Sequence, residues 1–253
     1  MCLLVCKPAN VNPNIRELYD LYIKARRVND DGFGFAYAKN GDVWSYRTID
    51  KLTYLDFADL VKDMDGTPAI LHWRWATGGY IDKDNCHPFL IYDAMGKPIA
   101  MAHNGIMDFP EIEGKSDTRQ LAEALEGQES EVIRKILDEF SDKGNKLASL
   151  DGDGKLVIHD SAKVGYWDKD GLWYSNYSHE AWSTKSTTTC GIGFKPSDPQ
   201  PVTTIDDDEK WLQSLCFDYG YDGVRKMIDD LEMKEAIRFA NSETYDDDTI
   251  ISD

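Results

Sequence analysis

Apolar residues recur along this chain with two different periods, and the two periods predict where strands and helices lie. A short apolar run over residues 2–6 ends in a stretch rich in proline and asparagine, and a helical pattern follows from residue 15 to about residue 27. Aromatic and small residues then alternate over residues 31–37, and a second stretch with a strand pattern, Val-Trp-Ser-Tyr, follows over 43–46. These stretches flank Asn40-Gly41, a dipeptide typical of tight hairpin turns, so we expect a β-hairpin there.

The strand and helix periods both recur through the middle of the chain. The sequence predicts further strands at residues 68–74, 89–92 and 99–103. It predicts further helices at about 54–64, 116–125 and 129–140. The remainder up to residue 194 is rich in strand patterns, with turns at 151–154 and 169–171. Antiparallel strands with helices grouped between them predict an α+β fold rather than a doubly wound parallel sheet.

The pattern changes after residue 195. Pro196-Ser-Asp-Pro-Gln-Pro201 has the composition of a linker, and acidic residues at 206–209 precede a region with an amphipathic helical pattern. We therefore expect one domain over residues 2–195 and an acidic, helical C-terminal extension over residues 196–253.

Composition restricts the class of protein. The formal net charge is −18, which disfavours nucleic acid and anionic membranes as partners. No apolar run approaches the roughly 20 residues needed to cross a bilayer, and the start of the chain lacks the pattern of a signal peptide. The five cysteines are scattered and odd in number, which does not indicate a disulfide framework. We expect a cytoplasmic enzyme with reduced thiols.

Four stretches carry candidate chemistry. Cys2 follows the initiator methionine, so removal of Met1 would give one residue both a thiol and an α-amine of pKa about 8 that can accept its proton. Arg74 ends a predicted buried strand and needs an anionic partner, for which a substrate carboxylate is suitable. Asn104-Gly105 ends another strand and offers an amide and a backbone N–H to one oxyanion. Asp117 begins a helix and could bind an ammonium group.

Each stretch also has a purely structural interpretation. Taken alone, Cys2 could simply precede a buried strand, Arg74 could form an internal ion pair, Asn104-Gly105 could be a tight turn, and Asp117 could belong to a helix cap. The order of the four stretches along the chain is more specific than any one of them.

That order resembles the class II glutamine amidotransferases, which are N-terminal nucleophile hydrolases. The resemblance rests on an N-terminal cysteine, then Arg74-Trp-Ala-Thr77, His103-Asn-Gly105 and Ser116-Asp-Thr118. Asp31-Gly-Phe-Gly34 and Asn85-Cys-His-Pro-Phe89 are most similar to the stand-alone branch of the family. The resemblance covers about residues 2–195 and implies a four-layer αββα sandwich of two antiparallel sheets.

The resemblance also implies a role for each matching residue. Cys2 would be the nucleophile, and Asn104 and Gly105 would form the oxyanion hole. Arg74 would bind the α-carboxylate of glutamine with help from Trp75 and Thr77, and Asp117 would bind the α-ammonium group. The implied reaction releases ammonia and glutamate through a γ-glutamyl thioester, and the ammonia passes to a separate synthetase or ligase.

Two departures from the family pattern keep other functions open. Gly78 stands where sugar-phosphate members of the family have a histidine, and the interval between Asn104 and Asp117 is short. An amidase acting on another γ-glutamyl or acyl-amide compound is one alternative, and a non-catalytic acidic interaction protein is another. The five histidines show no metal-binding spacing, so we expect core or turn histidines and neither a metal nor another cofactor.

Overall fold

The fold consists of two antiparallel sheets. A computed structural model describes residues 1–141 and 144–180 of the chain. One sheet has the strand order β3-β2-β4-β1-β10-β9 and the other has the order β5-β6-β7-β8. The first sheet comprises β1 (Leu3–Lys7), β2 (Gly32–Lys39), β3 (Asp42–Thr48), β4 (Ala69–Arg74), β9 (Tyr166–Trp167) and β10 (Trp173–Tyr174). The second comprises β5 (Phe89–Tyr92), β6 (Pro98–Asn104), β7 (Lys146–Asp151) and β8 (Leu156–His159).

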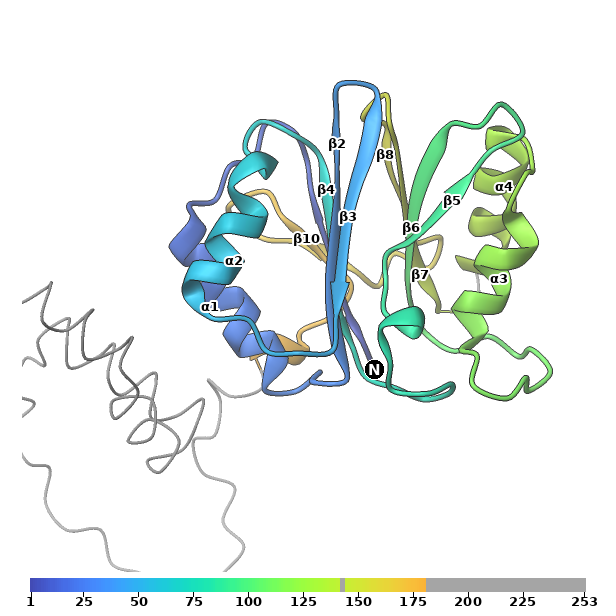
Figure 1. Cartoon of the computed structure of the whole chain (residues 1–253), viewed down its shortest axis with the longest axis horizontal. Coiled ribbons are helices and arrows are strands. Elements are labelled where there is room, and N and C mark those ends of the chain that lie inside the picture. Colours follow the sequence, from blue (N-terminus) through green and yellow to red (C-terminus); the bar gives the residue numbers. More distant parts are fainter. Residues whose placement is uncertain (142–143, 181–253) are drawn as a thin grey trace, which may run out of the picture. The chain divides into compact units, whose positions relative to one another are not determined.

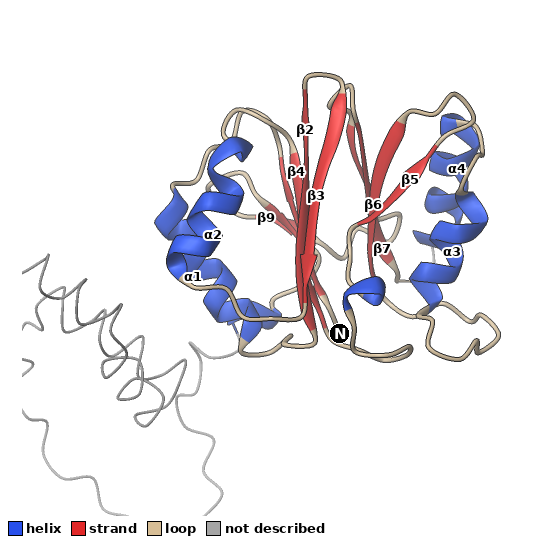
Figure 2. Cartoon of the chain, viewed as in Figure 1, coloured by secondary structure: helices blue, strands red, loops and turns tan. Residues whose placement is uncertain are grey.

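Helices cover the outer face of each sheet. On the six-stranded sheet lie α1 (Ile15–Arg26) and α2 (Tyr54–Val61), the latter extended by the 3₁₀ turn η1 (Lys62–Met64). On the four-stranded sheet lie α3 (Asp117–Leu125) and α4 (Ser130–Phe140). Figures 1 and 2 show the resulting order of layers, helices–sheet–sheet–helices. The predicted α+β class and the αββα sandwich implied by the resemblance are therefore confirmed.

The alternation of side chains along β1 divides it between two cores. Leu3 and Val5 pack toward α1 and α2, whereas Leu4 and Cys6 face the second sheet. All four are fully buried, so β1 is covered on both faces. Because its neighbours β4 and β10 also pair with it along both edges, β1 is a fixed central strand.

Small residues dominate the layer between the sheets. Alanines from both sheets meet there, at positions 36, 38, 100, 102 and 148. Gly34 belongs to the same face of β2, and a Cβ on it would lie 2.2 Å from the carbonyl oxygen of His87. The aromatic residues of β2 face the helices instead, where Phe33 and Phe35 join a cluster with Phe57 of α2. Small interior side chains thus let the two sheets approach closely, while the bulky ones pack under α1 and α2.

Local chemistry accounts for the positions of the helices and turns. Asn14 and Thr53 each close a capping box at the start of α1 and α2, which satisfies backbone N–H groups that have no helical partner. Asn40 and Gly41 both have positive φ angles, 58° and 82°, as a type I′ hairpin turn requires. The predicted hairpin over residues 31–46 is therefore confirmed, with both strands a little longer than expected.

The other predicted elements up to residue 180 are also present. The expected loop over 76–88 contains the short 3₁₀ turn η2 (Lys83–Asn85), and another, η4 (Ser178–Glu180), follows β10. The turn at 151–154 joins β7 to β8, and the turn at 169–171 joins β9 to β10. The helical extension expected over 196–253 lies outside the described residues. Within the described residues, no helix is long and apolar enough to span a membrane.

Candidate functional site

The Cys2 thiol lies directly before the first residue of the central strand β1. Its sulfur accepts a hydrogen bond from the backbone N–H of Trp75, with an N to Sγ distance of 3.3 Å. Burial raises the pKa of the Cys2 thiol, although the hydrogen bond from Trp75 and the positive charge of Arg74 act in the opposite direction. The thiol therefore keeps its proton near neutral pH, and reaction as a nucleophile requires a nearby base.

The backbone around Cys2 is held by the two residues that follow β10. Asn176 donates its side-chain amide to the carbonyl oxygen of Cys2 at 2.7 Å. The hydroxyl of Ser175 accepts the N–H of Leu4 at 2.9 Å, and the backbone N–H of Ser175 donates to the carbonyl of Leu4. These contacts fix the direction in which the first residues of the chain leave the sheet.

Strand pairing brings Arg74 next to the thiol. Leu3 pairs with Trp73 in the antiparallel ladder of β1 and β4, so the next position along the two strands sets Cys2 beside Arg74. The guanidinium group is buried, with Arg74 only 3% exposed. It donates to the carbonyl oxygens of Tyr80 at 2.9 Å and of Gly78 at 2.8 Å. The loop after β4 therefore folds back over Arg74 and holds its planar fork in one orientation.

Asp117 is the first residue of α3 and lies close enough to act on the same thiol. Its negative charge opposes ionisation of Cys2 and so contributes to the raised pKa of the thiol. One carboxylate oxygen accepts the N–H of Met107 at 2.8 Å, and the other accepts the N–H of Thr118 at 2.6 Å. Ser116 caps the helix by accepting the N–H of Arg119, so Asp117 is free of the capping role considered for it.

Arg74 and Asp117 have no counter-ion among the residues that the structure describes. Among residues 1–141 and 144–180, neither side chain takes part in an ion pair. Within the same residues the buried guanidinium donates only to two backbone carbonyls, so its remaining N–H groups can bind an anion. Opposite charges that both act on one thiol form a site suited to a zwitterion.

Asn104 ends β6 and reaches across to the first sheet. Its side chain is fully buried and donates to the hydroxyl of Ser175 at 2.8 Å, the same hydroxyl that accepts the N–H of Leu4. Ser175 thereby joins the Asn104 amide to the strand that carries Cys2. Among the described residues the amide nitrogen has no second acceptor, so one N–H is available to a further acceptor.

Gly105 follows Asn104 at a position where only glycine fits. A Cβ there would lie 1.9 Å from Oδ1 of Asn145 and 2.7 Å from Nε2 of His103. The same Oδ1 accepts the N–H of Ile106 at 3.0 Å, which fixes the turn after the strand. The lack of a side chain thus lets the backbone pass between Asn145 and His103.

The remaining predicted residues lie on the loop after β4. Trp75 contributes its N–H to Cys2, and its side chain is 45% exposed. Thr77 is exposed, and within the described part of the chain its side chain makes no hydrogen bond. A Cβ added to Gly78 would have no heavy atom within 4 Å, so the loop is open at this point. The structure brings Cys2, Arg74 and Trp75 together but leaves Thr77 at the surface.

Sequence reasoning assigned no role to three residues that support the site. Ser175 and Asn176 hold Cys2, Leu4 and Asn104, but a serine and an asparagine after a short aromatic strand carry no distinctive signal. Asp31 accepts the N–H of Ala76 at 2.7 Å. This bond anchors the start of the loop after β4, where the N–H of Trp75 contacts the Cys2 thiol. Asp31 does belong to Asp31-Gly-Phe-Gly34, one of the motifs on which the family resemblance rests, and this motif could have indicated that Asp31 supports the site.

Three histidines lie buried near the site. The rings of His72 and His87 stack with their centroids 4.1 Å apart, and His103 donates its backbone N–H to Nδ1 of His87. Burial lowers the pKa of all three, to about 3 for His72 and well below the ordinary value for His87. They are therefore neutral core residues at neutral pH. In the part of the chain that the structure describes, no three His, Cys, Asp or Glu side chains are grouped to hold a metal ion.

These neutral rings predict that the fold loses stability in mild acid. The unfolded histidines take up protons below about pH 6.5, whereas the buried rings do not until the pH approaches their lowered pKa values. The free energy of unfolding is therefore expected to fall between about pH 6.5 and pH 5, by up to about 1.4 kcal/mol per pH unit for each ring. Urea denaturation across this range measures the slope.

A His72→Gln variant is the matched control for this prediction. It removes one buried ring. The free energy of unfolding of this variant is therefore expected to fall less steeply with decreasing pH than that of the unmodified protein, by the contribution of one histidine. A free energy of unfolding that stays constant between about pH 6.5 and pH 5 would contradict the prediction.

The sequence of this chain is similar to those of known proteins. A family model described as class II glutamine amidotransferases matches residues 1–163. Glutamine--fructose-6-phosphate aminotransferase from Neisseria meningitidis serogroup A is 33% identical over 119 residues, which are 46% of this chain and 19% of the relative. The enzyme of the same name from Staphylococcus epidermidis is 30% identical over 174 residues, which are 66% of this chain and 25% of the relative. The chain thus spans about a quarter or less of these curated relatives.

Solved structures give more distant similarities. Glutamine phosphoribosylpyrophosphate amidotransferase from B. subtilis matches with a TM-score of 0.44 and 12% identity, covering 72% of this chain and 43% of that one. A structure of the allosteric regulatory enzyme of purine biosynthesis matches with a TM-score of 0.48 and 14% identity, with the same coverage.

Proposed function

This chain belongs to the class II glutamine amidotransferases, and on that basis we propose that Cys2 hydrolyses the side-chain amide of glutamine. The observation that carries the proposal is a pair of opposite charges, Arg74 and Asp117, which both act on the Cys2 thiol and have no counter-ion within residues 1–141 and 144–180. Free glutamine has an α-carboxylate for Arg74 and an α-ammonium group for Asp117. When both ends are bound, the side-chain amide is directed toward the sulfur.

The first chemical step needs a base, because burial raises the pKa of the thiol. Met1 is 64% exposed, so its removal costs little buried surface and frees the α-amine of Cys2. An α-amine has a pKa of about 8, which suits it to take the thiol proton as the sulfur attacks the amide carbon. The resulting tetrahedral oxyanion accepts hydrogen bonds from the Asn104 amide and the Gly105 N–H, each worth roughly 3–4 kcal/mol.

Collapse of that intermediate breaks the carbon–nitrogen bond. The protonated α-amine gives its proton to the leaving nitrogen, and ammonia departs, leaving a γ-glutamyl thioester on Cys2. Water then attacks the thioester with the α-amine again acting as base, and glutamate leaves. No metal or other cofactor takes part in these steps.

An acceptor for the ammonia is the second part of the proposal. Loops that carry site residues expose a set of large apolar side chains, here called the apolar rim: Trp75, Tyr80, Ile81, Ile106 and Ile112. Exposed apolar side chains gathered on loops beside a site favour a docking partner over open solvent. We propose that a separate synthetase or ligase binds the apolar rim and receives the ammonia.

A second substrate class is supported by the open loop at Gly78. Thr77 is exposed and a side chain at position 78 would meet nothing, so the wall of the site is incomplete beside Arg74. A larger γ-glutamyl compound with a free α-carboxylate and a free α-amine would fit the same pair of charges. Comparison of glutamine with γ-glutamyl amides of increasing size separates the two classes.

The test of the proposed function is release of glutamate and ammonia from glutamine by protein of known N-terminus. Intact mass measurement first establishes whether Met1 has been removed. Protein that begins at Cys2 is expected to release both products, and protein that retains Met1 is expected to release neither, because its α-amine is acylated. Absence of release by processed protein, alone and with candidate acceptors, would contradict the proposal.

A further inference from the structure

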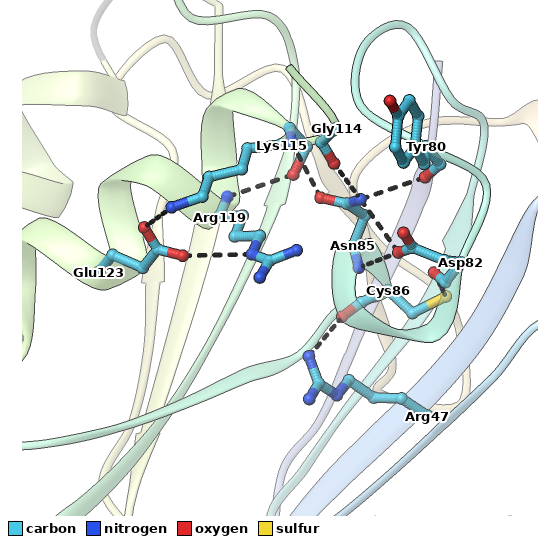
Figure 3. A network of polar contacts seen from close by, with 10 residues as sticks. Arg47, Tyr80, Asp82, Asn85, Cys86, Gly114, Lys115, Arg119 and Glu123 are labelled. Atoms are coloured by element: carbon cyan, nitrogen blue, oxygen red, sulfur yellow. Dashed lines mark hydrogen bonds and ion pairs between the residues drawn. The ribbon is translucent and has the colours of Figure 1, made fainter. Parts of the chain in front are cut away.

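The side chain of Asn85 is the centre of a polar network beside Arg74. Asn85 ends the 3₁₀ turn η2 and is fully buried. Its amide nitrogen donates to the carbonyls of Gly114 at 2.8 Å and Tyr80 at 3.2 Å, and to the carboxylate of Asp82 at 3.0 Å. Its amide oxygen accepts the N–H of Ser116 at 2.9 Å. Figure 3 shows the amide between the loop that contains Tyr80 and the segment that contains Gly114.

The two segments joined by Asn85 carry the two charged groups of the site. Tyr80 is the residue whose carbonyl also accepts from Arg74, so Asn85 and Arg74 share one acceptor. Ser116, on the other side, directly precedes Asp117 and caps its helix. A continuous series of contacts therefore runs from Arg74 through Tyr80, Asn85 and Ser116 to Asp117.

The backbones of these segments also touch without Asn85. The N–H of Tyr80 donates to the carbonyl of Gly114 at 3.3 Å. A Cβ added to Gly79 would lie 2.5 Å from the nitrogen of Ser116, and Gly79 has a φ of +72°. A side chain at position 79 is therefore both strained and obstructed, and would push the segments apart.

We propose that Asn85 is a positioning residue that sets the distance between the Arg74 guanidinium and the Asp117 carboxylate. The inference rests on the proposed function, since those two groups are taken to bind the ends of one amino acid. Asparagine is suited to this task because one planar amide donates to one segment and accepts from the other. Fixing the segments before the substrate arrives fixes the length and orientation of the amino acid that the site holds.

The test compares two reagents that label the Cys2 thiol. A glutamine-shaped diazoketone must be held by both Arg74 and Asp117 to react, whereas iodoacetamide is small, uncharged and needs neither. In an Asn85→Ala variant, labelling by the diazoketone is expected to slow by about ten- to hundredfold, while labelling by iodoacetamide stays within about threefold. For turnover, KM for glutamine is expected to rise by a similar factor with a smaller change in kcat.

A second variant and a matched control protect the test against misfolding. Gly79→Ala keeps Asn85 but separates the same segments, so it is expected to slow the diazoketone selectively as well. Asn12→Ala removes the amide oxygen that accepts the backbone N–H of Gly66, a hydrogen bond that joins two loops past the end of β1 away from Cys2. It is expected to change neither labelling rate.

Different labelling results would contradict the positioning role of Asn85 and the proposed hydrolysis of glutamine by Cys2. Unmodified protein labelled by the diazoketone, with both Asn85→Ala and Gly79→Ala labelled equally fast, would overturn the positioning role and leave the proposed function standing. Equal slowing by both reagents would also overturn it, because general disturbance of the thiol would then explain the loss. Unmodified, processed protein that the diazoketone does not label would overturn the proposed function and the positioning role together.

Discussion

Replacing Cys2 with alanine is expected to abolish glutamine hydrolysis, with kcat falling by at least about 10⁴-fold. The substitution removes the sulfur, which in the proposed mechanism is the only protein atom that bonds to the amide carbon of the substrate. The fold is expected to survive, because the sulfur is held only by the backbone of Trp75 and the carbonyl of Cys2 is still bound by Asn176. Glutamate release measured at saturating glutamine gives kcat for the variant and the unmodified protein.

Cys6→Ala is the matched control for this loss. Cys6 lies on the same strand, is fully buried between the sheets, and has a thiol whose pKa is strongly raised by burial. It cannot act as a nucleophile near neutral pH, so its removal is expected to reduce stability by about 1–2 kcal/mol and leave kcat unchanged. A Cys2→Ala variant that keeps more than about one hundredth of the activity would remove Cys2 from the mechanism.

Replacing Arg74 with lysine is expected to lower kcat/KM for glutamine by about 10²- to 10³-fold, mostly through KM. Lysine keeps a positive charge but cannot donate to the carbonyls of Gly78 and Tyr80 while also binding a carboxylate with two parallel hydrogen bonds. The loss should therefore depend on the substrate having a free α-carboxylate. Steady-state rates for glutamine and for its α-amide test this directly.

The α-amide provides the decisive comparison for Arg74. Unmodified protein is expected to prefer glutamine strongly over the α-amide, whereas Arg74→Lys is expected to hydrolyse the two at nearly equal rates. Arg119→Lys is a suitable control, since Arg119 forms a partly exposed ion pair with Glu123 on α3 and takes no part in the site. If Arg74→Lys loses the same factor for both substrates, Arg74 supports the loop without binding the carboxylate.

Much of the fold was accessible from the sequence because the information is local. Asn40-Gly41 fixes its hairpin through the positive φ angles that the turn requires, and Asn14 and Thr53 fix helix starts through side chains that reach three residues along the chain. Alternation over residues 31–37 distinguishes the face of β2 that packs under the helices from the face of small residues between the sheets.

The arrangement of the site was less accessible, because it depends on pairing between distant strands. Nothing local indicates that Leu3 pairs with Trp73, and a shift of one position would move Arg74 away from Cys2 and to the opposite face. Resemblance to the family nominated Cys2, Arg74, Asn104 and Asp117 as a set. It did not nominate Ser175, because a serine becomes a support only when its neighbours in space are known.

The position of Ser175 also has a consequence during synthesis of the chain. The hydroxyl that holds Leu4 and Asn104 comes from a residue 171 positions after Leu4. During synthesis, the strand β1 that follows Cys2 gains its second neighbour only when β10 has been made. The backbone around Cys2 is therefore among the last parts of the two sheets to be set in place, although it is made well before β10.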